Sequence, residues 1–116
     1  MTEDKLEMPR GALELLVLKG LARGSQHGYG LARWIEMRSD GALLVEEGSL
    51  YPAVHRLERR GLIDAEWGMT DTGRRAKSYS LSDDGRRELR RRTARWNKLA
   101  NGVALVLRAR SAGGAL

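Results

Sequence analysis

The stretch EGSLYPAVHRLERRG, residues 47–61, carries the pattern that decides the fold. Its apolar residues Leu50, Val54 and Leu57 recur at helical spacing, which predicts a helix over residues 48–60 with one buried stripe. The acidic residues just before the stripe complement the positive end of a helix dipole, and the closing glycine is typical of a helix stop. Such a helix needs neighbouring elements that cover its apolar face.

The flanking segments predict two more helices and a β-hairpin. Apolar spacing indicates helices over residues 10–23 and 28–39, and the short apolar run at residues 43–45 resembles a strand. Strands over residues 62–67 and 76–81, joined by a turn that contains glycine, predict the hairpin. Three helices followed by a hairpin is the element order of a winged helix-turn-helix domain.

A long helix is predicted over residues 83–109, after a winged helix-turn-helix domain that we expect to span residues 9–82. The fold class is therefore mostly α with a small β-hairpin, and residues 1–8 and 110–116 are predicted to be disordered tails. The long helix has a heptad-like seam that its own small domain cannot bury, so a second copy of the chain is the expected partner. The seam consists of Leu89, Thr93, Trp96, Ala100, Val103 and Leu107.

Composition and charge limit the possible functions. The 116 residues include no cysteine and two histidines, which excludes disulfides, thiolate zinc sites and a histidine-rich metal site. No hydrolase triad or phosphate-binding loop is recognisable, so we expect no enzyme, metal or cofactor. Residues 1–54 carry six Lys/Arg against eight Asp/Glu, a net charge of −2, whereas residues 55–116 carry fifteen against seven, a net charge of +8. A basic half of this kind favours a nucleic-acid partner.

The cellular compartment can also be predicted. The first eight residues include three acids, where a secretory signal would need a basic start and an apolar stretch. Every apolar run is far shorter than the ~20 residues of a membrane span. We therefore expect a cytoplasmic protein with no membrane partner.

The side chains opposite the apolar stripe are candidates for binding double-stranded DNA. Arginine can donate a fork of hydrogen bonds to guanine, whereas tyrosine and histidine can bond phosphates or base edges. We expect the helix to enter the major groove, and the hairpin tip at residues 68–77 to contact the backbone or the minor groove. The candidate DNA-binding residues are Ser49, Tyr51, His55, Arg56 and Arg59 on the helix, and Arg74, Arg75 and Lys77 on the hairpin.

Alternative interpretations of the same residues stay open. The outer helix face and the arginine-rich run at residues 86–95 could be ordinary solvated surface, and charges on a hairpin edge discourage unwanted strand pairing. Trp34 and Trp67 are interpreted as packing residues, and Trp96 as a residue of the dimer core. The alternative function is a winged-helix module that binds protein without specific DNA readout, and an acidic or apolar outer helix face would favour it.

Four short motifs, in this order and spacing, resemble the PadR-like family of bacterial transcriptional regulators. The resemblance covers residues 9–108 and implies a homodimeric winged-helix repressor of the short subfamily, with one C-terminal helix packed across the dimer. It also implies a small planar aromatic effector, held at the dimer centre beside a residue such as Trp96. Glu46 stands where the family usually has serine or threonine. The motifs are RGALELLVL (10–18), HGYGLA (27–32), EGSLYPA (47–53) with RLERRGLI (56–63), and GRRAK (73–77) followed by Tyr79 and Leu81.

Overall fold

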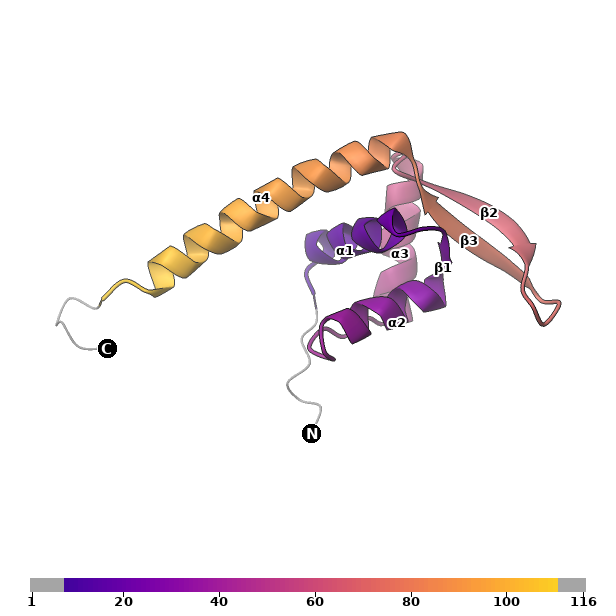
Figure 1. Ribbon diagram of the computed structural model, residues 1–116, viewed down its shortest axis with the longest axis horizontal. Helices are drawn as coiled ribbons and strands as arrows, with labels where there is room; N and C mark the ends of the chain where they lie inside the picture. The colour runs from indigo at the N-terminus through magenta and orange to yellow at the C-terminus, as the bar shows by residue number, and fades with distance from the viewer. Residues whose placement is uncertain (1–7, 111–116) are drawn as a thin grey trace.

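The chain folds into a three-helix bundle, a hairpin on one side of it, and a long helix that leads away on the other side (Figure 1). The computed structural model describes residues 8–110, so most of the two predicted tails lies outside the described residues. The prediction of a winged helix-turn-helix with a long C-terminal helix is confirmed. The elements are α1 (Arg10–Ala22), β1 (Gln26–His27), α2 (Gly28–Arg38), α3 (Glu47–Arg59), β2 (Ile63–Met69), β3 (Arg75–Leu81) and α4 (Asp83–Leu107).

The sheet has three antiparallel strands in the order β1-β3-β2. Its third member is the two-residue β1, which the sequence did not indicate, and the prediction of a strand at residues 43–45 is wrong. Leu43 forms only an isolated bridge. The N–H of Val45 donates to Oε2 of Glu36 on α2 at 3.3 Å, so a side chain satisfies this backbone group in place of a strand partner. Because the side chain of Val45 is buried, this apolar run is a core-forming loop.

The hydrophobic core lies between α1, α2, α3 and the root of the hairpin. The predicted stripe of α3 is confirmed, since Leu50, Val54 and Leu57 are fully buried, together with Ala53. Burying a side chain of this size stabilises the fold by ~1.5–3 kcal/mol relative to leaving it exposed. The largest fully buried side chains are Leu18, Leu21, Leu31, Leu50, Leu57, Ile63, Val17 and Val54.

The first turn of α4 is fixed to the turn between α3 and β2. Ser82 caps the helix as predicted, because its Oγ accepts a hydrogen bond from the N–H of Gly85 at 3.0 Å. The same hydroxyl donates to the carbonyl of Gly61 at 2.7 Å. A Cβ at Gly85 would lie 2.0 Å from the carbonyl oxygen of Leu62, so the helix can approach this closely only with glycine there. Leu89 packs against the core one turn later, whereas the second half of α4 is almost entirely exposed.

Candidate nucleic-acid interface

The outer face of α3 is a narrow exposed stripe. Gly48, Pro52, His55 and Arg59 are exposed and follow one another at intervals of three or four residues, opposite the buried stripe. A proline in a helix removes one N–H, and here the carbonyl that loses its partner belongs to the exposed Gly48. Ser49 is also exposed, in the first turn. This face is polar and basic at its C-terminal end, with neither acidic nor apolar character.

Two candidate residues of α3 do not point away from the bundle. Tyr51 is half-buried, and its ring lies so close to Gly28 of α2 that a Cβ there would be 2.9 Å from it. Arg56 is half-buried as well, and its Nε donates to Oε2 of Glu14 on α1 at 2.6 Å. The expectation that both side chains project outward is wrong. Both positions flank the exposed stripe, where α2 covers one of them and α1 the other.

Arg56 belongs to a network of ion pairs that joins three helices. The other oxygen of Glu14 accepts from Arg92 of α4 at 2.9 Å, and Arg92 also donates to Glu88 at 2.6 Å. The side chains of Glu14, Glu88 and Arg92 keep only 9–13% of their exposure. Burial raises the pKa of Glu14, but the hydrogen bonds and charges of Arg56 and Arg92 outweigh burial and hold this pKa below its ordinary value. The network is invisible in the sequence, because the pairs to Glu14 span 42 and 78 positions.

The tip of the hairpin is rich in cations. Arg74 and Arg75 are exposed, whereas Lys77 is half-buried and its Nζ lies 3.9 Å from Oε1 of Glu58 on α3. This ion pair places the C-terminal half of α3 directly beside the hairpin. The cations of both elements can therefore act on one ligand.

Trp67 differs from the sequence interpretation. It does not pack in the core but keeps 55% of its surface exposed. The guanidinium of Arg75 lies 4.5 Å from the centroid of its ring, and Nζ of Lys77 lies 5.9 Å from it. The other tryptophan interpreted as a packing residue, Trp34, does pack against the core. Trp67 is exposed because β2 continues beyond the edge of the bundle, which strand alternation alone does not indicate.

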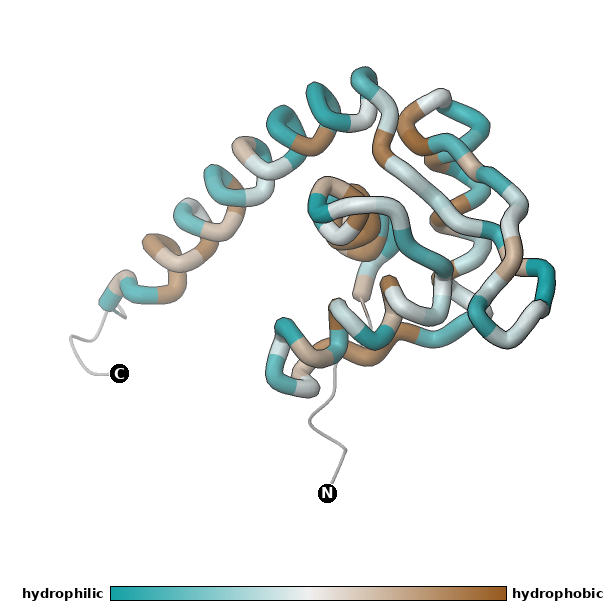
Figure 2. The backbone as a smooth tube through the Cα atoms, turned by 45° about the vertical axis from the view of Figure 1, so that its right-hand side comes forward, coloured by the Kyte–Doolittle hydropathy of each residue, from teal (hydrophilic) through white to brown (hydrophobic). Residues whose placement is uncertain are grey.

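The predicted seam of α4 is divided between two environments. Leu89 is covered by the core of its own chain, whereas Thr93, Trp96, Ala100, Val103 and Leu107 are exposed. Figure 2 shows hydrophobic residues recurring along this unsupported part of the helix. The heptad count missed Leu99 and Val106, which surround a shallow apolar groove with Val103, Leu107 and Gly102.

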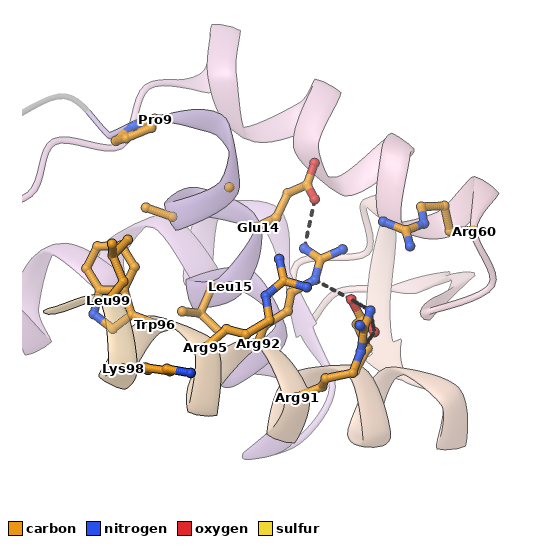
Figure 3. A pocket seen from close by; sticks show the side chains of 13 residues that line it. Pro9, Glu14, Leu15, Arg60, Arg91, Arg92, Arg95, Trp96, Lys98 and Leu99 are labelled. Carbon is orange, nitrogen blue, oxygen red and sulfur yellow. Dashed lines mark hydrogen bonds and ion pairs between the residues drawn. The ribbon is translucent and has the colours of Figure 1, made fainter. Parts of the chain in front are cut away.

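An open groove with a volume of about 840 Å³ lies between α1 and α4 (Figure 3). Trp96 and Leu99 form one end of it, and Arg91 and Arg92 lie toward the other, with Glu14 reaching in from α1. The groove therefore combines an aromatic wall with several cations. Its lining consists of Pro9, Gly11, Ala12, Glu14, Leu15, Arg60, Glu88, Arg91, Arg92, Arg95, Trp96, Lys98 and Leu99.

Two further searches of residues 8–110 gave negative results. No three His, Cys, Asp or Glu side chains gather there in a way that could hold a metal ion. None of the helices in this part of the chain combines the length and the apolar character that crossing a membrane requires.

Comparisons with known proteins identify the family. The pattern of the family described as "Transcriptional regulator PadR-like family" matches residues 17–91. Transcriptional regulator Rv3488 of Mycobacterium tuberculosis is 36% identical over 83 residues, which are 72% of this chain and 74% of that protein. A solved PadR family transcriptional regulator from Eggerthella lenta is also 36% identical, with a TM-score of 0.73 over 86% of this chain and 85% of that one. A PadR-like transcriptional regulator from Bacillus cereus is 25% identical, again with a TM-score of 0.73, over 86% of this chain and 95% of that one.

The chain therefore belongs to the PadR-like family of transcriptional regulators, as its four motifs predicted. Members of this family are regulators of transcription rather than enzymes, which agrees with the function class expected from the sequence.

Proposed function

We propose that the protein is a homodimeric DNA-binding repressor that places α3 in the major groove and the hairpin tip, residues 68–77, on the backbone or in the minor groove. The observation that carries this proposal is the exposed stripe of α3, which presents His55 and Arg59 beside the basic hairpin. A helix fits the major groove, and a hairpin beside it reaches the adjacent backbone. The family and the net charge of +6 support a polyanionic partner.

We assign base reading to the exposed residues of α3. His55 and Arg59, with Ser49 at the start of the helix, can reach base edges without leaving any partner inside the protein. Tyr51 lies at the margin of this face and suits a phosphate contact through its hydroxyl. Arg56 is a positioning residue in this proposal, because its guanidinium is already bonded to Glu14 and holds α3 against α1.

Replacing Arg59 with alanine tests this assignment. We expect a loss of ~1–3 kcal/mol on the operator and a much smaller loss on random DNA, because a base contact contributes only on the correct sequence. Competition binding on both DNAs measures the two losses. Arg56→Ala is the matched control, and it should weaken binding to both DNAs by similar factors, since it disturbs the position of α3. An equal loss on both DNAs for Arg59→Ala would assign Arg59 to phosphate binding.

The operator should reflect the symmetry of the dimer. Two copies of α3 related by a two-fold axis read inverted half-sites about one helical turn apart, ~34–36 Å from centre to centre. Equal binding to operator and random DNA by the unaltered chain would favour the alternative function, a protein-binding winged-helix module.

The second half of α4 is the proposed dimer interface. Trp96, Leu99 and Val103 follow one side of this helix and leave an apolar strip that a single chain does not cover. Trp96→Glu should raise the dimer dissociation constant at least tenfold, since each interface would then bury or expel two like charges. Sedimentation equilibrium measures this constant. Thr93→Glu, on an exposed flank of the same helix, is the control. A monomeric unaltered chain at micromolar concentration would contradict the proposed interface.

The small planar effector implied by the family stays a prediction, and the groove between α1 and α4 is where we place it. An aromatic ring could stack on Trp96, and Arg91, Arg95 and Lys98 could attract an anionic substituent. Glu14 and Arg92 line the same groove, so a ligand there would touch the network that holds α3.

A further inference from the structure

The two faces of the hairpin differ in charge. Because side chains alternate along a strand, Asp64 and Glu66 of β2 lie on one face, opposite Ser80 and Ser78 of β3. We call this the acidic face. DNA would be repelled from it, because the phosphate backbone carries negative charge. The hairpin can therefore approach DNA only with its other side.

The other face is an outward continuation of the core. Ile63, at the root of β2, is fully buried on this face, and Tyr79, which pairs with Ala65, is buried as well. Beyond the edge of the bundle, the same face carries two pairs, Trp67 with Lys77 and Met69 with Arg75. We call these four residues the aromatic-cationic face. It contains two cations, which lie over an exposed indole ring.

The exposed ring is arranged as a contact surface. Trp67 is 55% exposed and Met69 is 71% exposed, although both belong to the face that packs inward elsewhere. Arg75 stacks 4.5 Å from the centroid of Trp67, and within residues 8–110 no carboxylate forms an ion pair with Arg75. The indole therefore restricts the guanidinium while leaving all of its donors available. A ligand that offers both an apolar surface and an anion would satisfy both groups.

We propose that Trp67 is a DNA-contacting residue, which packs its indole against the deoxyribose sugars of one strand while Arg75, held on the ring, binds the adjacent phosphate. This inference rests on the proposed function and adds an apolar contact to it. Double-stranded DNA is the ligand that the face fits, because the sugar-phosphate backbone alternates apolar and anionic groups at short spacing. Lys77 bridges the aromatic-cationic face to Glu58 of α3, so the wing contact continues directly from the groove-reading helix.

Substitutions at the two members of the stack separate apolar from ionic contributions. Trp67→Ala should weaken operator binding about tenfold and leave the salt dependence of binding unchanged, because no charge is lost. Arg75→Ala should weaken binding and lower the slope of log K against log salt by about 1.8 for two phosphate contacts in a dimer. Trp67→Tyr, which keeps an aromatic ring, should retain most of the affinity. Glu66→Gln on the acidic face is the matched control and should not weaken binding.

A direct measurement avoids reliance on folding of the variants. The chain labelled with 5-fluorotryptophan gives one fluorine NMR signal for each of its three tryptophans, and Trp67→Phe identifies the signal of Trp67. On addition of operator DNA, this signal should shift and lose its solvent isotope shift between H₂O and D₂O, since the sugar excludes water from the ring.

The outcomes distinguish this inference from the proposed function. Operator binding with an unchanged isotope shift at Trp67, together with full affinity of Trp67→Ala, would overturn the indole contact and leave the DNA-binding function standing. A labelled, unaltered chain that binds no duplex DNA would overturn both.

Discussion

Replacing Glu14 with alanine should destabilise the folded chain by about 3 kcal/mol. The substitution removes the only carboxylate that Arg56 pairs with in residues 8–110 and one of two partners of the poorly exposed Arg92. Removing one partner of a buried pair is costly, because the remaining charge cannot recover its hydration. Urea unfolding of the unaltered chain and the variant measures the difference.

The matched control for Glu14 is an exposed ion pair on α4. Asp84 pairs with Arg87, and both side chains are about two-thirds exposed. Asp84→Ala should therefore cost well under 1 kcal/mol from the lost pair. Equal losses for the two variants would show that the network of Glu14 contributes no more than a surface pair.

Acid should weaken the same network. Burial raises the pKa of Glu14, but the bonds and charges of its two arginines outweigh burial and lower it below 4.5. Hydrogen bonds from Arg92 are the main cause that lowers the pKa of Glu88. A carboxylate with a lowered folded-state pKa stabilises the fold above its ordinary pKa, and this stability is lost as the pH falls through the folded value. Glu14→Gln should therefore lose less stability than the unaltered chain between neutral pH and pH values below 4.5.

Gly85→Ala should destabilise the chain by ~1–3 kcal/mol, although alanine is the better helix former. The new Cβ would meet the carbonyl oxygen of Leu62 at 2.0 Å and Cδ1 of Leu81 at 2.7 Å. The first contact is with backbone, so α4 must shift away from the turn between α3 and β2. Urea unfolding measures the loss.

Gly102→Ala is the matched control within the same helix. A Cβ at Gly102 meets nothing within 4 Å, so only helix propensity acts, and the change should stabilise α4 by ~0.5–1 kcal/mol. The two substitutions should thus have opposite signs. A stabilising Gly85→Ala would show that α4 does not rest on Leu62 in solution.

Periodic patterns in the sequence predicted the fold well. The stripe of Leu50, Val54 and Leu57 and the cap at Ser82 depend on neighbours within a few positions, and both appear as predicted. The run ending at Val45 failed this approach, because its apolar side chains signal burial equally well in a loop. What satisfies the backbone there is Glu36, a residue outside the pattern.

The candidate site was harder to predict, because residue type does not show which partner a side chain finds. Arg56 and Arg59 are the same residue type on the same helix, yet only Arg56 meets a carboxylate, and that carboxylate lies on α1. Trp67 has the composition of a core residue but lies where its strand has left the bundle. Such differences are set by tertiary contacts between distant segments, which no single window of sequence contains.

The fixed base of α4 makes this helix a lever. Its first turns are held at Gly85 and Arg92, and the remaining part, from residue 93 to residue 107, extends about 22 Å beyond the last clamp. A tilt of about 5° at the base would therefore displace the far end by about 2 Å. If two such arms are joined at their ends, the same gearing runs in reverse, and a small sliding between the arms would rotate each base together with the helix it is bonded to. The distance between the two reading heads would then report, on an enlarged scale, how the arms are seated against each other.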